Sequence, residues 1–183
     1  MTNQKNSQLQ SALMSGIILG VALIIFSLIL YVVGINPVEK KIWGLPSILI
    51  LIAGIVYGTL KYRNDTLGGS ISYGQALGTG VLIALFAGVL NSIYSYVFMT
   101  IIDPAFIDQI KMIAEEGMIE KGMSDDQIER TMEVAGWAYS PWYLTVMGVV
   151  GNVFYGFIIS LISSAFIKKE KSIFDSDETI ADE

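Results

Sequence analysis

The fold is decided by residues 6–38, NSQLQSALMSGIILGVALIIFSLILYVVGINPV, which contain no Asp, Glu, Lys, Arg or His. A helix needs about 20 apolar residues to cross the roughly 30 Å hydrocarbon core of a bilayer, and this stretch is long enough. Because lipid offers no hydrogen-bond partner to the backbone, a run of this length is expected to be helical. The stretch therefore predicts a membrane-spanning helix.

Three further stretches, at residues 42–60, 66–102 and 134–167, also lack acidic and basic side chains. Each is long enough to span a bilayer in the same way. The fold class predicted is an all-α integral membrane protein with four transmembrane helices and a helical extracytoplasmic insert between helices 3 and 4. The spans are placed near residues 13–33, 43–60, 75–99 and 142–167.

The composition agrees with a bilayer as the solvent. Hydrophobic residues make up 53% of the 183 residues, and the mean hydropathy is +0.59. The chain has no Cys and no His, which excludes disulfides, thiolate chemistry and histidine-based acid and base catalysis. It has no basic patch for nucleic acid. We therefore expect no cofactor, no bound metal and no nucleic-acid partner.

Basic residues near the span ends predict the orientation, because Lys and Arg are enriched on the cytoplasmic side. Four spans place both termini and the link between helices 2 and 3 on one side. That side has Lys5, Lys61, Arg63, Lys168, Lys169 and Lys171, whereas the first link on the opposite side has Lys40 and Lys41. We expect a multi-pass protein of the cell inner membrane with both termini cytoplasmic.

The chain divides by composition into five segments. Residues 1–10 are expected to be a cytoplasmic N-terminus, 11–102 the first three spans, 103–136 an acidic extracytoplasmic insert, 137–167 the last span, and 168–183 a disordered cytoplasmic tail.

The insert has nine acidic residues and three basic ones. Its apolar residues recur at helical spacing from Phe106 to Gly117, which predicts an amphipathic helix lying on the membrane or on the other spans. Ser124 with Gln127 predicts a capping box that starts a second helix after a link near Gly122.

Small residues recur at every fourth position in the third and fourth spans. Helices in lipid associate by close backbone approach, so these ridges are expected to face each other. Ordinary packing inside one bundle is favoured over an oligomer seam or a substrate path. The helix-packing residues predicted are Ala76, Gly80, Ala84, Gly88, Gly148 and Gly156.

Asn91 and Asn152 are the most polar side chains expected at membrane depth. Each could bond to another helix or line a small polar cavity, and interhelical bonding is the commoner use. The carboxylates of the insert, such as Glu115 and Glu116, are favoured as a solvated face over a catalytic pair. The spans contain no charged residue, which disfavours proton-coupled transport, and no residue is assigned as catalytic.

A short run at the start of the third span, Ser72 to Gly78 (SYGQALG), together with Asp103 and Pro104 and the pair Gly16 and Gly20, resembles a family. This is the family of small bacterial membrane proteins catalogued as domain of unknown function 4199. The resemblance covers residues 8–169. It implies a four-helix inner-membrane protein with an outer helical insert, and it brings no activity or catalytic residue.

The function expected is that of a non-enzymatic accessory or scaffold subunit, because charged intramembrane residues, metal ligand sets and nucleophile constellations are all missing from the sequence. The alternative is a small oligomeric passive or sodium-linked transporter with Asn91 and Asn152 in its path. An enzyme that uses the insert carboxylates comes third. The partners expected are the lipid bilayer and either another membrane protein or a second copy of the chain.

Overall fold

The structure is a computed structural model of the chain that describes residues 2–35 and 44–169. The expected start of the second span at residue 43 and most of the expected disordered tail, residues 170–183, lie outside the described residues. Six α-helices account for most of the described chain: α1 (Thr2–Val32), α2 (Gly44–Lys61), α3 (Tyr73–Val97), α4 (Phe106–Glu120), α5 (Asp125–Ala135) and α6 (Pro141–Ile167).

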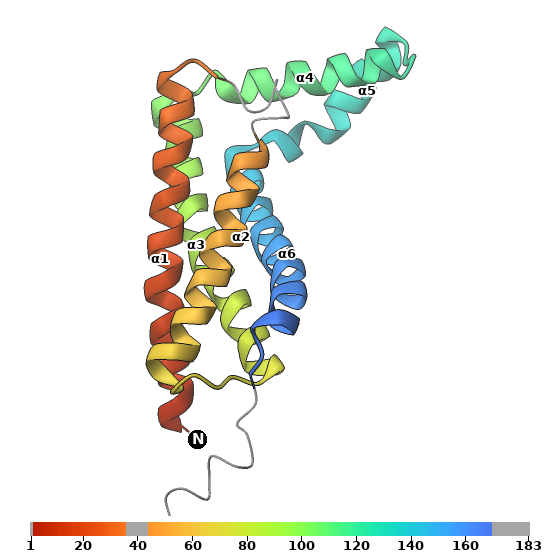
Figure 1. Cartoon of the computed structure of the whole chain (residues 1–183). Helices are drawn as coiled ribbons and strands as arrows, with labels where there is room; N and C mark the ends of the chain where they lie inside the picture. The colour runs from red at the N-terminus through yellow and green to blue at the C-terminus, as the bar shows by residue number, and fades with distance from the viewer. Residues whose placement is uncertain (1, 36–43, 170–183) are drawn as a thin grey trace, which may run out of the picture.

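Four of these helices form an antiparallel bundle, and α4 and α5 project from one end of it (Figure 1). The N-terminus, the link from α2 to α3 and the end of α6 lie together at the other end. Within the described residues, four segments are long and apolar enough to cross a membrane: Lys5–Val32, Gly44–Thr66, Tyr73–Ile102 and Pro141–Ile167.

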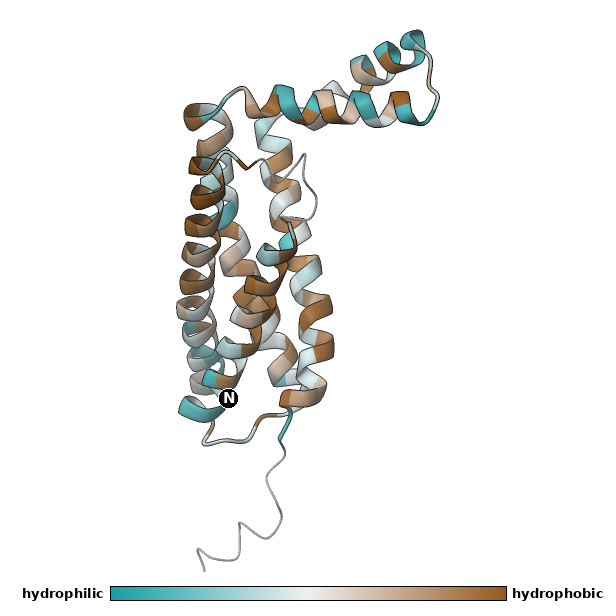
Figure 2. Cartoon of the chain, turned by 45° about the horizontal axis from the view of Figure 1, so that its top comes forward, coloured by the Kyte–Doolittle hydropathy of each residue, from teal (hydrophilic) through white to brown (hydrophobic). Residues whose placement is uncertain are grey.

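The bundle core combines small and large apolar residues, and many more large apolar residues lie on its outside. Ala12, Ala84 and Ala87 are fully buried in its core. Val32 and Phe166 are 82% and 84% exposed. Hydrophobic residues recur along all four long helices (Figure 2). This distribution suits a lipid environment, in which apolar side chains face the solvent and small residues allow the helices to approach.

Local sequence sets the helix boundaries. The side-chain oxygen of Ser72 accepts from the backbone N–H of Gln75 at 3.3 Å, and Gln75 Oε1 accepts from the N–H of Ser72, so a capping box starts α3. The backbone N–H of Ser124 likewise donates to Gln127 at the start of α5, as expected. Gly122 has φ of +78° in the link between α4 and α5, a conformation that favours glycine.

The first helix begins at Thr2, before the span that is placed near residues 13–33. Gln8, in this early part of α1, contacts α3.

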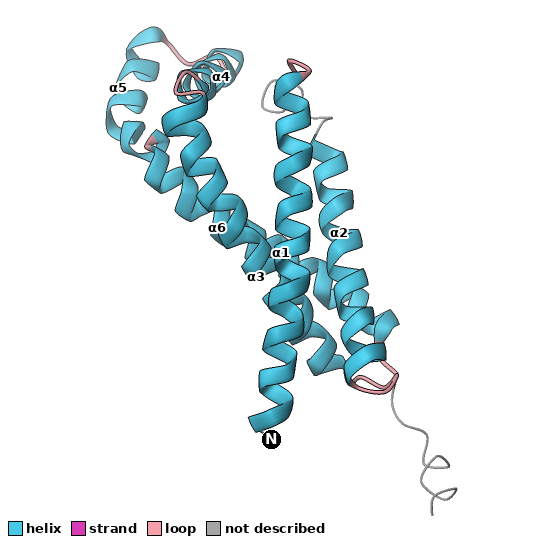
Figure 3. Cartoon of the chain, turned by 90° about the vertical axis from the view of Figure 1, so that its left-hand side faces the viewer, coloured by secondary structure: helices cyan, strands magenta, loops and turns pink. Residues whose placement is uncertain are grey.

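The end of the bundle opposite α4 and α5 is fastened by backbone contacts. Ile71 and Lys169 form an isolated antiparallel bridge with N···O distances of 2.8 and 3.0 Å. Arg63 Nη1 donates to the carbonyl of Ile167, and the Tyr73 hydroxyl donates to the carbonyl of Leu161, each at 3.1 Å. The end of α6 is therefore held against both ends of the link between α2 and α3, while its beginning leans away from α1 and α2 (Figure 3).

Candidate functional site

The seam between α3 and α6 is the most extensive helix contact in the bundle. A methyl group added at Gly156 would overlap the Cβ of Ala84, and one added at Gly80 would overlap the side chain of Ser160. A Cβ at Gly88 would lie 2.9 Å from the Cβ of Asn152. The backbones therefore approach closely along this seam, as helix association in lipid requires.

The remaining two ridge residues occupy different surroundings. Ala76 is fully buried in a second apolar cluster with Tyr62, Ile71 and Ile167 at the fastened end. Gly148 is exposed, and a Cβ there would meet only the Ser92 hydroxyl, at 3.4 Å. The close contact between α3 and α6 thus loosens toward the start of α6.

Asn91 and Asn152 do not bridge helices within the described part of the chain. Asn152 Nδ2 donates to the carbonyl of Gly148, one turn earlier in its own helix, at 3.1 Å. Its Cβ packs against Gly88, three residues before Asn91 in α3. Asn91 is half-buried. A helix can satisfy an amide from its own carbonyls, so Asn152 needs no partner helix for its donor.

A polar contact between α1 and α3 was not predicted from the sequence. Gln8 Nε2 in α1 donates to the hydroxyl of Thr79 at 3.0 Å and to the carbonyl of Gln75 at 3.3 Å in α3. Thr79 is fully buried and donates in turn to the same carbonyl. The sequence contained one signal for this contact, because Gln8 and Gln75 are expected at the same end of an antiparallel bundle.

Two buried hydroxyls in α6 have no hydrogen-bond partner among the described residues. These are Ser160 and Ser164, 0% and 1% exposed. Ser160 lies directly against Gly80, so the space around its hydroxyl is already filled by the neighbouring helix. The pair contributes to tight packing and leaves no room there for a ligand.

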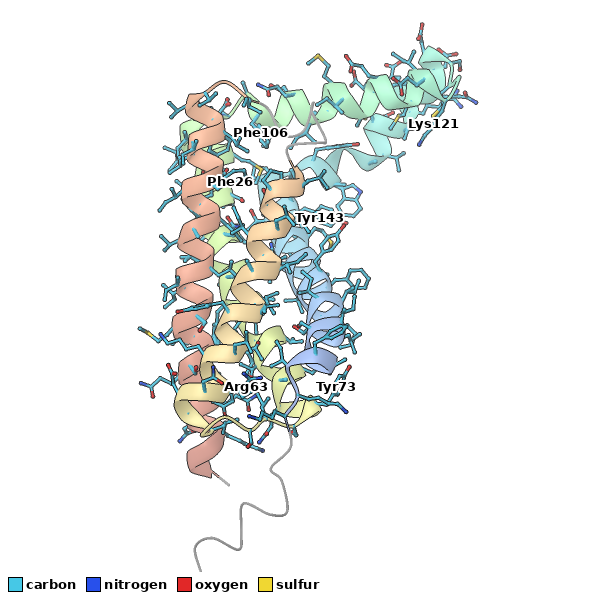
Figure 4. All side chains as sticks on the ribbon, viewed as in Figure 1. Phe26, Arg63, Tyr73, Phe106, Lys121 and Tyr143 are labelled. Carbon is cyan, nitrogen blue, oxygen red and sulfur yellow. The ribbon has the colours of Figure 1, made fainter. Side chains whose placement is uncertain are left out.

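A cavity of about 410 Å³ lies at the end of the bundle that bears α4, between α1, α3, α4 and the start of α6. Phe98 lines this cavity, and its ring centroid lies 5.1 Å from that of Tyr31, 5.9 Å from that of Tyr94 and 5.4 Å from that of Phe106. Asp103 also lines this cavity. Figure 4 shows Phe106 at this end and Tyr73 at the opposite end. The cluster anchors the start of α4 to the bundle through aromatic edge contacts.

A longer groove of about 740 Å³ runs between α1 and α2. It has polar side chains, including Lys61, at the fastened end of the bundle and apolar side chains toward the middle. We call it the α1–α2 groove.

The carboxylates of α4 and α5 are spread over an exposed surface. Asp108 and Lys111 form an exposed ion pair on one helix face, with an N···O distance of 3.7 Å. Such pairs contribute little to stability. Within the described chain, no three acidic residues gather into a group that could hold a metal ion.

Comparison with known proteins identifies the family. No curated protein and no solved structure matches the chain. A family model described as "Protein of unknown function (DUF4199)" matches residues 14–169, which include the SYGQALG run and the Asp103–Pro104 pair. The match covers most of the chain, from the first span to the last. The chain therefore belongs to this family of unknown function.

Proposed function

We propose that the chain is a non-enzymatic accessory subunit of the bacterial inner membrane, which binds another membrane protein through its α4–α5 hairpin. In this proposal the four long helices span the membrane, both termini lie in the cytoplasm, and the hairpin lies on the opposite side. The hairpin is defined as residues 106–135.

The observation that carries the proposal is the position of the hairpin. It stands out sideways from the end of the bundle (Figure 1). All residues of α4 are described, and none of their side chains is buried. In α5, which is also fully described, Ile128 is the buried residue. Met112, Ile119 and Val134 are 50%, 59% and 75% exposed. These exposed apolar side chains, on an element that projects from the bundle, are available to contact a partner.

The charge of the hairpin favours a protein partner over the lipid surface. Residues 106–135 have eight acidic side chains and three basic ones. Anionic lipid headgroups attract basic segments and repel acidic ones. A basic protein surface would complement the hairpin and guide the encounter. The partner proposed is therefore a membrane protein with a basic outer surface.

The orientation is supported by the basic residues at the fastened end of the bundle. Lys5, Lys61 and Arg63 all lie there, with Lys168 and Lys169 at the end of α6. Reporter enzymes active on one side of the membrane test this topology when one is fused after Lys169 and another is inserted near Gly117. We expect activity on opposite sides. Activity on the same side would contradict the topology.

Position-specific cross-linking in native membranes tests the accessory role. A photo-reactive residue at Ile119 of the hairpin is compared with one at Ile162 of α6, which is similarly exposed, at 61%, on the bundle. We expect one protein adduct from position 119 that is absent at 162 and that weakens when Glu116 and Glu120 are changed to Lys.

Two results would contradict the proposal. Adducts of equal yield at both positions would show that the hairpin has no selectivity. Adducts between copies of this chain alone would favour the oligomeric transporter instead.

A further inference from the structure

The α1–α2 groove has a chemical gradient along its length. Its polar end, near the ends of the helices, is lined by the side chains of Ser7, Gln10 and Ser11 of α1 and by Tyr57 and Lys61 of α2. Its apolar end, toward mid-bundle, is lined by side chains that include Ile18, Ala22, Ile50 and Ala53. Its volume of about 740 Å³ is within the range typical of ligand sites.

The polar end can bind an anion. Lys61 forms no ion pair within the described part of the chain, and the hydroxyl and amide groups around it supply further donors. None of the described side chains that line the groove is acidic. Asp65 lies in the next helical turn, outside the lining, and the nearby Arg63 already donates to Ile167 and Asn64. The local charge at the lining is therefore positive.

The length of the groove identifies the class of ligand. From Ser7 to Ala22 the α1 helix rises about 22 Å at about 1.5 Å per residue. Half of a bilayer that is about 40 to 45 Å thick, headgroups included, has the same depth. A second transmembrane helix would need a groove along the whole hydrocarbon core of about 30 Å. The groove therefore matches one leaflet and not a spanning segment.

From this match we infer that the α1–α2 groove binds one phospholipid of the cytoplasmic leaflet. The phosphate lies at Lys61 among the hydroxyls of the polar end, and an acyl chain lies along Ile18 and Ala53. Exposed apolar side chains alone would bind lipid without preference, whereas the single lysine makes an anionic headgroup the favoured ligand. The inference rests on the membrane topology proposed above, which decides the leaflet.

The test uses the full-length chain purified in detergent and native mass spectrometry with phosphatidylglycerol or phosphatidylcholine as the added probe. Wild-type protein is expected to retain one phosphatidylglycerol per chain at lower lipid concentrations than phosphatidylcholine. Lys61→Gln should weaken phosphatidylglycerol binding about fivefold and leave phosphatidylcholine nearly unchanged. The matched control is Lys168→Gln, which removes the same charge at the same end of the bundle but outside the groove, and it should bind as wild type.

A second pair of variants tests the apolar end. Ala53→Phe fills the groove from an exposed position and should remove both lipids. Ile52→Phe adds bulk to a neighbouring exposed residue that does not line the groove, and it should bind as wild type. The helical circular dichroism of all four variants should equal that of wild type.

Three results would overturn the site. Wild-type lipid retention in both Lys61→Gln and Ala53→Phe would place the lipid elsewhere. Equal losses in the controls would show unspecific binding. A dimer that dissociates in Ala53→Phe while lipid is retained would assign the groove to a second copy. Lipid binding in detergent does not depend on how the protein is oriented in a membrane. Intact lipid binding together with reporter activity on the same side of the membrane would therefore overturn only the assignment to the cytoplasmic leaflet.

Discussion

Gly156 is the residue at which the approach of α6 to α3 is closest. A Cβ there would overlap the Cβ of Ala84, and neither atom can move without moving its backbone. We expect Gly156→Ala to destabilise the bundle by about 1 to 3 kcal/mol, the usual cost of overpacking. Gly151→Ala is the matched control, because no described heavy atom lies within 4 Å of its Cβ position. There the gain in helix propensity, up to about 1 kcal/mol, should dominate.

Unfolding by sodium dodecyl sulfate in mixed micelles, followed by circular dichroism, measures both glycine variants. Opposite signs of the change in unfolding free energy support the close contact between α3 and α6. Two changes of the same sign and size would contradict it.

Gln8 is the residue that joins α1 to α3 by polar contact. Its amide donates to Thr79 Oγ1 and to the carbonyl of Gln75. We expect a double-mutant cycle of Gln8→Leu and Thr79→Val to give a coupling of about 0.5 to 1 kcal/mol, the size found for hydrogen bonds between membrane helices. The same SDS unfolding assay measures it. If the changes in unfolding free energy of the two single variants add up to that of the double variant, the hydrogen bond between Gln8 and Thr79 makes no net contribution to stability.

These residues also show what sequence can and cannot predict at the level of side chains. The spacing of Gly80, Ala84 and Gly88 predicts a small-residue face, and the structure puts that face against α6. Spacing does not tell which polar side chain finds a partner on another helix. Asn152 donates within its own helix, whereas Gln8, outside the expected span, reaches α3. Which polar side chain contacts another helix depends on how each helix is rotated about its axis and on where it begins and ends. A single sequence does not determine either.

The α4–α5 hairpin is the element whose local signals are strongest. Ser124 and Gln127 predict the start of α5, and Gly122 lies in the link with φ of +78°. We expect Gly122→Ala to cost about 1 to 2 kcal/mol locally, because an L-residue with a Cβ rarely adopts this conformation. Gly117→Ala in α4 is the matched control, since the space there is open and the helix should gain stability.

Amide hydrogen exchange resolved by peptide measures this effect. Faster exchange is expected in residues 106–135 of Gly122→Ala, with the four long helices unchanged. Equal exchange in the two variants would contradict the role of the turn. An effect that spreads into the long helices would show that the hairpin and the bundle unfold together.

At the scale of the whole molecule, the number of long helices could be predicted, but only part of their arrangement could. Lipid requires long uncharged helices, so residues 6–38, 42–60, 66–102 and 134–167 are visible as four candidates. The small-residue ridges predict that α3 faces α6, and the structure confirms this contact. Small residues also occur on α1 and α2, however, and they do not reveal that α1 packs mainly against α3. The lean of α6 and the two hollows that border α1 follow from that arrangement.

The arrangement separates the molecule into a bundle and a hairpin that depend little on each other. Phe106 packs on Phe98 and fixes the start of α4, while the rest of α4 buries no side chain. We expect replacement of residues 108–136 by a flexible glycine and serine linker to leave the bundle inserted, with its SDS unfolding midpoint close to that of wild type. The linker needs only to join the retained ends, and loop closure depends weakly on its length.

The same deletion tests whether function resides in the hairpin. Because the replacement also removes position 119, binding is followed by co-purification with the partner identified from that position, and the deleted chain should lose this partner. The bundle should still bind phosphatidylglycerol, because the α1–α2 groove lies at the opposite end of the bundle. Loss of membrane insertion would show instead that the hairpin is needed to assemble the spans. Retention of the protein partner by the deleted chain, trapped from a photo-reactive residue on α6, would move the interaction surface from the hairpin to the bundle.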